Sequence, residues 1–400
     1  MPGFESQRRR NSADHTHSTI FTTIVTKGPL SRKDISALTG LSQSTVTKAV
    51  KPLLAAGFVV EEKEQVQGPG RPVIPLRVNP ERHHVVGIKV ARHELTGVLI
   101  DPQADVLASA RRPVGSSDPE GVATEIAELA HQLIEREPRF ADSAEGLGVA
   151  FGGHVDGRSG VLRYSPMLGW HDVPMGEMLE ARTELFTVVE NDVNALAVAE
   201  QWFGAGRDIP SFAVVTVGAG VGCGLVVDRE LLHGATGMAG ELGHVVVRPE
   251  GERCLCGNRG CLETVASEGA ILRAARRAGR AVETLDDAAV LARGGDEACR
   301  RAFVDAGKAL AQGISIVLNL VNPARVILSG EGVVASDLLL DNLRESLRKH
   351  TFSDAAGCDV VTRPLADESW ARGAAANALR HLIDRPQHQR LPVPALESRR

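Results

Sequence analysis

Three runs of apolar residues at helical spacing occupy residues 18–57. The first run ends at Gly28-Pro29, the second lies between a Ser31 N-cap and Gly40, and the third follows a Ser42 N-cap. The apolar positions that recur every three or four residues are Ile20, Ile24, Val25, Ile35, Leu38, Val46, Ala49, Val50, Leu53 and Leu54. Three short helices this close together predict a helix-turn-helix.

A two-stranded hairpin is predicted directly after the third helix. Residues 58–60 and 73–76 are strand-like, and the segment 68–72 between them is rich in glycine and proline. The hairpin predicts the wing of a winged helix-turn-helix domain over residues 18–80. Residues 1–17 are polar and are expected to form a mobile arm. We also expect this domain, the head, to be a unit separate from the rest of the chain.

From residue 85 onward, short apolar strands alternate with longer helical runs. The predicted strands are residues 85–90, 95–100, 146–151, 186–189, 213–217, 225–227 and 325–328. The predicted helices are residues 121–137, a helical region over 268–320, and residues 371–383. This alternation is typical of an α/β body. The polar segment 385–400 is expected to be a disordered tail.

The charge distribution fits a small basic head on a larger acidic body. Residues 1–82 hold 12 Lys and Arg against 7 Asp and Glu, a net charge of +5, while the whole chain carries −5. Such asymmetry favours nucleic-acid binding by the head, although an excess of five charges also arises by chance. The chain is 43% apolar, but no run approaches the roughly 18 apolar residues of a membrane helix. We therefore expect a cytoplasmic protein.

The third helix of the head presents polar side chains opposite its apolar stripe, and these are the candidate DNA contacts. They are Gln43, Ser44, Thr45, Thr47 and Lys48. A solvated helix face has the same appearance, but the predicted wing adds Arg71 on a stiff backbone between Gly70 and Pro72. An arginine placed in this way suits an A·T-rich minor groove. Two such heads in a dimer would require an inverted repeat as operator.

Three cysteines and a histidine form a candidate metal site. His244 precedes Cys254 by ten residues, and Cys254, Cys256 and Cys261 lie within eight residues of one another. In a reducing compartment this spacing favours a Cys₃His zinc site over a disulfide. The alternative is a set of reduced thiols with an unrelated histidine.

Polar residues near this metal site suit a ligand rich in hydroxyl groups. Asn191 and Asp192 follow a predicted strand, where open α/β sheets bind ligands. Glu241 precedes His244 by three residues, and Glu263 follows Cys261 by two. Sugar hydroxyls both donate and accept hydrogen bonds, so carboxylates, an amide and a histidine together favour a sugar.

Three motifs of the chain resemble the ROK family, which is named for repressors, open reading frames and sugar kinases. They are residues 190–195, residues 237–244 and the run Cys254-x-Cys256-Gly-x-x-Gly-Cys261-x-Glu263. The resemblance covers nearly the whole chain and implies a two-lobed, actin-like body of the sugar kinase and ribonuclease H-like type, with sugar between the lobes. The first lobe would comprise residues 83–190 and 370–384, and the second residues 191–369.

The resemblance also implies functional residues in this body. His244, Cys254, Cys256 and Cys261 would hold Zn²⁺. The residues implied to contact sugar are Gly153, His154, Ser165, Asn191, Asp192, Glu241, His244 and Glu263. His154 and Met167 differ from the commoner residues of the family's kinases, which leaves the identity of the sugar open.

One motif of the family's kinases is missing. Their first hairpin carries Asp-x-Gly-Gly-Thr, whose glycine amides hold ATP phosphates, whereas residues 89–93 of this chain are Lys-Val-Ala-Arg-His. Side chains therefore occupy the approach of the phosphates. A glycine loop at 218–224 remains, which on its own is weak evidence for a nucleotide.

These observations predict a sugar-responsive transcriptional regulator, a repressor of carbohydrate genes, whose body is a sensor without enzymatic activity. We expect a homodimer or tetramer that binds operator DNA and a small sugar effector. The alternative from another class is an ATP-dependent sugar kinase that carries a DNA-binding head. Control of DNA affinity by a protein partner instead of a sugar also remains open.

Overall fold

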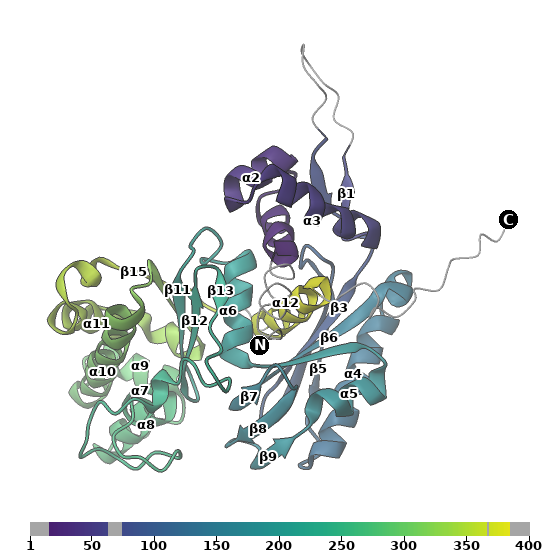
Figure 1. The fold of residues 1–400 in the computed structure, drawn as a ribbon. Helices are drawn as coiled ribbons and strands as arrows, with labels where there is room; N and C mark the ends of the chain where they lie inside the picture. The colour runs from purple at the N-terminus through teal and green to yellow at the C-terminus, as the bar shows by residue number, and fades with distance from the viewer. Residues whose placement is uncertain (1–15, 63–73, 366–367, 385–400) are drawn as a thin grey trace, which may run out of the picture.

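The computed structural model describes residues 16–62, 74–365 and 368–384, which form a head above a two-lobed body (Figure 1). Residues 1–15 of the predicted arm, Arg71 with the turn of the predicted wing, and the predicted tail over 385–400 lie outside the described residues.

The head contains the three predicted helices and a short antiparallel pair of strands. A helix covers residues 16–27, and the later elements are α2 (Arg32–Thr39), α3 (Gln43–Ala56), β1 (Val59–Glu61) and β2 (Leu76–Val78). Ser31 forms a capping box with Asp34 at the start of α2, and Gly40 ends this helix at a φ of 72°. Ser42 caps α3.

The assignment of residues 16 and 17 to a mobile arm is wrong, because both lie in the first helix. The Ser18 backbone N–H donates to Asp384 Oδ1 at 3.1 Å. This contact holds the start of the helix against the C-terminal end of the body, which an apolar pattern beginning at Ile20 did not reveal.

The first lobe contains a five-stranded sheet in the order β10-β6-β3-β4-β5. Its strands are β3 (His84–Val90), β4 (Glu94–Ile100), β5 (Val106–Pro113), β6 (Ala144–Phe151) and β10 (Phe186–Asn191). α4 (Pro119–Glu135) and α5 (Met175–Thr183) bury one face of the sheet, and α12 (Ser369–Asp384) packs on β3 and β6 from the other. Gly87 and Gly148 permit this approach, because a Cβ at either position would overlap backbone atoms of α12.

A small three-stranded sheet extends from the end of β6. It consists of β7 (His154–Asp156), β8 (Val161–Ser165) and β9 (Trp170–Val173). The sequence analysis placed no strands here, because these segments contain few consecutive apolar residues.

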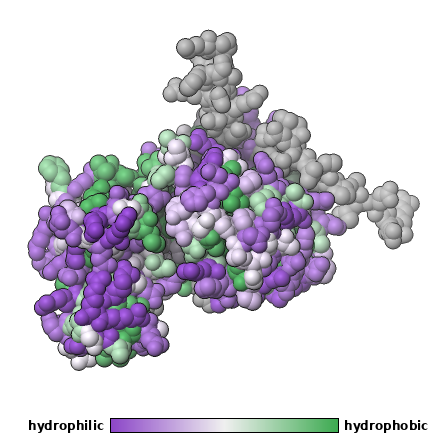
Figure 2. Space-filling model, turned by 90° about the horizontal axis from the view of Figure 1, so that it is seen from below, coloured by the Kyte–Doolittle hydropathy of each residue, from purple (hydrophilic) through white to green (hydrophobic). Residues whose placement is uncertain are grey.

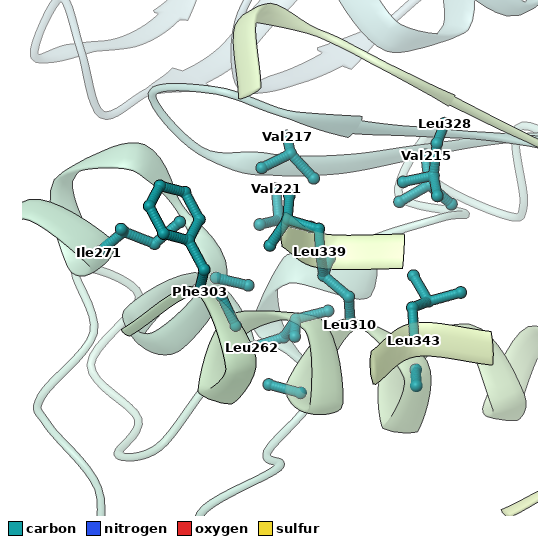
Figure 3. Packing of buried hydrophobic residues seen from close by; sticks show 14 of the residues in the cluster. Val215, Val217, Val221, Leu262, Ile271, Phe303, Leu310, Leu328, Leu339 and Leu343 are labelled. Atoms are coloured by element: carbon teal, nitrogen blue, oxygen red, sulfur yellow. The ribbon is translucent and has the colours of Figure 1, made fainter. Parts of the chain in front are cut away.

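The second lobe repeats the plan of a five-stranded sheet covered by helices, in the order β13-β12-β11-β14-β15. Its strands are β11 (Phe212–Val217), β12 (Val221–Val227), β13 (Glu230–Leu231), β14 (Arg325–Ser329) and β15 (Asp359–Thr362). Its helices are α7 (Glu263–Ala266), α8 (Glu268–Arg277), α9 (Leu285–Arg293), α10 (Glu297–Val321) and α11 (Ser336–His350). Val217 and Val221 from the sheet pack toward Phe303 and Leu310 of α10 (Figure 3).

The predicted glycine loop over 218–224 is mostly a strand. Only residues 218–220 form a turn, closed by a hydrogen bond from Gly218 N–H to Gly220 O at 3.0 Å. Residues 221–224 begin β12 and pair with β11. Gly222 and Gly224 are needed for packing, because Val193 and Ala197 of α6 (Asp192–Phe203), which precedes this sheet in the chain, pack directly against them.

α10 is long and apolar enough to cross a membrane by length and composition alone, but 56% of its apolar window is buried in the structure. It packs against α8, α9 and α11, as the central helix of a folded lobe does. Figure 2 shows the molecule from below, where hydrophilic residues predominate on both lobes and hydrophobic patches interrupt them on the second.

The head is not a separate unit, contrary to the sequence-based expectation. Phe21 and Ile24 of the first helix share one buried cluster with Trp202 and Leu379 of the body. The Phe21 and Trp202 rings lie 6.2 Å apart between centroids. The apolar stripe of the first helix therefore serves both the core of the head and its junction with the body.

Candidate ligand site, metal centre and nucleic-acid interface

The four predicted metal ligands converge. One ligand atom from each of His244, Cys254, Cys256 and Cys261 lies within 4.8 Å of the others. His244 Nδ1 is 3.5 Å from Cys254 Sγ, and the sulfurs of Cys256 and Cys261 are 3.6 Å apart. Three thiols and one imidazole nitrogen at such separations fit the closed tetrahedral donor set of structural zinc.

The fold of this loop requires glycines. Gly257 and Gly260 have φ angles of 97° and 70°, and a Cβ at Gly260 would overlap the carbonyl of Arg248. Burial raises the pKa of the Cys261 thiol to about 12. A bound divalent metal ion would hold this sulfur as thiolate in spite of its burial.

Glu241 lies near four of the other predicted sugar-binding residues. It precedes a short 3₁₀ helix over Leu242–His244, and burial raises the pKa of its carboxyl above the usual range. The charged groups close enough to influence this pKa are those of His244, His154, Glu263 and Asp192. The cluster thus draws on both lobes and on the start of α6 (Asp192–Phe203), the helix between them.

His244 links this cluster to the metal site. Its Nδ1 faces Cys254, whereas its Nε2 lies 3.8 Å from Glu241 Oε2. Glu263 Oε1 is 3.8 Å from the Cys254 sulfur, so a second carboxylate borders the same cysteine. The two predicted sites are therefore adjacent.

Other predicted sugar-binding side chains already have partners within the protein. Asn191 Oδ1 accepts from the Val193 N–H at 2.9 Å as the N-cap of α6, and its Nδ2 donates to Gly153 O at 2.9 Å. Ser165 is fully buried and donates to Gly152 O at 3.0 Å. These residues shape the backbone around Asp192, where the Gly152-Gly153 turn comes close to its carboxylate.

His154 also has a partner. Its Nε2 donates to the Thr236 carbonyl oxygen at 2.7 Å, which leaves Nδ1 as the ring nitrogen available to a ligand.

The sequence analysis missed an ion pair that involves Asp192 of this cluster. The Lys89 ammonium at the end of β3 binds the Asp192 carboxylate, and it also lies 5.2 Å from the centre of the Trp370 ring. The two charged side chains are only 14% and 18% exposed. Lys89 was recognised in the sequence as a replacement in the phosphate-binding motif, but its partner is 103 residues away in the chain.

A carboxylate borders the remaining glycine turn. Glu331 lies directly against Gly218, so a negative charge faces the backbone that would have to approach a phosphate group. Together with Ala91 and Arg92 at the glycine positions of the kinase motif, this makes two departures from what a nucleotide-binding cleft requires.

The predicted DNA contacts occupy one side of α3. The side chains of Val46, Ala49, Val50 and Leu53 are buried in the head, while four of the five predicted contact residues are exposed and Thr45 is half-buried. Ser44 and Thr45 hydroxyls bond to the Ser42 hydroxyl at 2.8 Å, and Thr47 donates to Gln43 O. Gln43 and Lys48 have the longest side chains of the set.

The chain belongs to the ROK family, whose model matches residues 85–381, and a winged helix-turn-helix DNA-binding model matches residues 14–60. The chain is 30% identical over 366 residues to the DNA-binding transcriptional dual regulator NagC of Escherichia coli, covering 89% of this chain and 90% of that protein. It is 27% identical to the xylose repressor of Bacillus subtilis, and the match covers 90% of this chain and 94% of that repressor.

Solved structures agree with this assignment. The crystal structure of a ROK family transcriptional regulator, a homolog of the E. coli MLC protein, superposes with a TM-score of 0.77 at 26% identity over 93% of this chain and 96% of that one. A ROK family glucokinase from Streptomyces griseus, also 26% identical, superposes with a TM-score of 0.65 over 74% of this chain and 99% of that one. The regulator matches head and body, whereas the kinase matches a shorter part of the chain.

These comparisons confirm the predicted fold class and the predicted function. The chain is a DNA-binding transcriptional regulator with a winged helix-turn-helix and a sugar-kinase-like body, and the relatives that support this assignment are named as transcriptional regulators and repressors.

Proposed function

We propose that this regulator is a cytoplasmic repressor whose effector is a sugar bound by Asp192, Glu241, His244 and Glu263. The support is the convergence of these side chains around Glu241, beside the turn at Gly152-Gly153. Two of the repressors that the chain resembles are named for N-acetylglucosamine and xylose. Each carboxylate bond to a sugar hydroxyl would contribute about 1.5–3 kcal/mol.

Zinc in the Cys₃His site would hold the sugar site in shape. When Nδ1 of His244 binds the metal, Nε2 must carry the proton and can donate to a sugar hydroxyl. Cys254, Cys256 and Cys261 would complete the coordination.

The head would place α3 in the major groove of the operator, with Gln43, Ser44, Thr45, Thr47 and Lys48 facing the DNA and Arg71 in an adjacent A·T-rich minor groove. Homodimers or tetramers would present two heads to an inverted repeat. We assign residues 18–80 to the DNA-binding domain, residues 83–190 with 370–384 to the first lobe, and residues 191–369 to the second.

A single helix supports coupling between the two functions. α6 begins with Asp192 in the sugar cluster and carries Trp202, which packs on Phe21 of the head, near its other end. Its 12 residues span about 18 Å. A sugar that shifts the start of α6 would therefore shift the surface on which the head rests.

Isothermal titration calorimetry with glucose, xylose and N-acetylglucosamine tests the proposed sugar site. Glu241→Gln keeps the shape of the side chain but removes its charge, and should weaken the best-bound sugar by about tenfold or more. Glu283→Gln, at a surface position far along the second lobe, should leave binding unchanged. The absence of saturable binding of any sugar by the wild-type protein would refute the proposal.

A further inference from the structure

A buried carboxylate lies directly beside the proposed sugar site without belonging to it. Glu190 is the residue before Asn191 on β10, and it is only 2% exposed. Its Oε1 accepts from the Asn191 N–H at 2.8 Å and from Asn194 Nδ2 at 3.1 Å. Both donors bond to the same oxygen, so the buried Oε2 needs a donor of its own.

The partner of its second oxygen comes from the other lobe. His233 Nε2 donates to Glu190 Oε2 at 2.8 Å, across 43 residues of sequence. The His233 side chain is 36% exposed, while that of Glu190 is 3% exposed, so the imidazole covers the carboxylate from the solvent side. Burial of a carboxylate in this position depends on that partner.

His233 opens a segment that contacts the first lobe repeatedly, and we call residues 233–237 the interlobe segment. Besides the Glu190 contact, its Thr236 carbonyl accepts from His154 Nε2 at 2.7 Å, and its Ala235 carbonyl accepts from Arg158 Nη2 at 2.7 Å. Gly237 packs against the backbone of Val155, at a φ of 85° that favours glycine. All three first-lobe side chains lie on β10 or on the β7 hairpin.

The interlobe segment leads directly into the sugar site. The Ala239 N–H donates to His233 O at 3.1 Å, and Glu241 follows two residues later. At the other end of the contact, Glu190 is followed at once by Asn191 and Asp192. The hydrogen bond between His233 and Glu190 therefore joins the stretch of chain that carries Asp192 to the stretch that carries Glu241.

We propose that His233 is a positioning residue for the effector. Its bond to Glu190 fixes the distance between the Asp192 side and the Glu241 side of the sugar site. The interlobe segment as a whole holds the two lobes together at this point. The proposal rests on the proposed sugar site for its effect on affinity. Its effect on the mobility of the interlobe segment does not depend on any sugar, because the contacts are made between residues of the chain itself.

Hydrogen exchange of the sugar-free, full-length protein tests the contact itself. His233→Ala should speed amide exchange in peptides spanning residues 233–241, since the segment loses its anchor to the first lobe. His233→Gln keeps a side-chain N–H at a similar reach and should restore most of the protection. Arg158→Ala, an exposed position that does not endanger folding, should also speed exchange, whereas Arg163→Ala on the same hairpin should not.

Calorimetry with the sugar that binds wild type best then tests positioning. We expect about tenfold weaker binding for His233→Ala, recovery to within threefold for His233→Gln, and operator affinity without sugar within twofold of wild type for both. Unchanged exchange over residues 233–241 in His233→Ala would overturn the inference, whatever the sugar does. Faster exchange with undiminished sugar affinity would overturn the positioning role, and failure of wild type to bind sugar would instead refute the proposed function.

Discussion

His244 is the residue on which two functions meet, because one ring nitrogen faces the cysteines and the other faces Glu241. We expect one zinc ion per chain, and we expect its removal by a chelator to weaken sugar binding by about tenfold, in the range seen when groups supporting a metal site are lost. Elemental analysis and calorimetry on the same sample measure both quantities.

The matched variants for this prediction are two cysteine substitutions. Cys254→Ser should lower the zinc content and the sugar affinity together, while Cys358→Ser, on a thiol outside the cluster, should alter neither. Full sugar affinity in zinc-free protein would show that the two sites are independent.

His84 makes a prediction about pH. It is fully buried, its ring stacks on Phe140 with centroids 4.0 Å apart, and burial lowers its pKa from 6.5 to about 4. Between these two values the unfolded chain binds the proton and the folded chain does not. His84 therefore makes the free energy of unfolding fall as the pH drops from 6.5 toward 4, by up to about 1.4 kcal/mol per pH unit.

Urea unfolding of wild type and His84→Phe at pH 7, 6 and 5 measures this effect. The variant should lose less stability between pH 7 and pH 5 than wild type, while His131→Phe on the exposed side of α4 should follow wild type. Equal pH slopes for wild type and His84→Phe would contradict the prediction.

For single residues, the sequence predicted which side chains belong to a site better than it predicted which side chains they contact. The spacing of His244 and the cysteines predicted a cluster that the structure assembles. The Lys89–Asp192 and His233–Glu190 pairs could not be predicted, because each joins residues on separate elements that only the tertiary fold brings together.

Among the elements, α6 contacts both functional regions: Asp192 lies in the sugar cluster, and Trp202 packs against the head. We expect Trp202→Phe to bind sugar within twofold of wild type, because the substitution lies at the far end of the helix. The effect of sugar on operator affinity should nevertheless shrink several-fold, because a smaller ring transmits the displacement of α6 poorly to Phe21.

Fluorescence anisotropy of labelled operator, with and without saturating sugar, gives this ratio for each variant. Trp170→Phe is the control, since Trp170 packs on Phe151 inside the first lobe and has no role at the head. A full sugar response in Trp202→Phe would exclude the α6 route.

The prediction of helices and strands succeeded where the apolar periodicity was strong, and it failed where polar residues or glycines interrupted a strand. The apolar stripes of α3 and of residues 371–383 correspond to helices that bury their apolar side chains. β5 was missed because its exposed edge carries Ser109, Arg111 and Arg112, and the glycines at 222 and 224 suggested a loop where close packing of α6 requires them in a strand.

For the whole molecule, the continuity between head and body matters most. One buried cluster runs from Ile20 and Phe21 in the head to Trp202 in α6 and Leu379 in α12. The sequence suggested a separate head because apolar residues of a helix do not reveal which partner they bury against. A shared core gives a change in the body a physical means of reaching the DNA-binding surface.

The central claim is that sugar in the body controls DNA binding by the head. The most direct measurement is the affinity of the full-length protein for an operator duplex selected from random DNA, determined by anisotropy as glucose, xylose and N-acetylglucosamine are each added without ATP. The account predicts that at least one sugar changes the operator Kd by about tenfold, equivalent to about 1.4 kcal/mol of coupling. An operator affinity that no sugar changes, although calorimetry detects sugar binding, would contradict it.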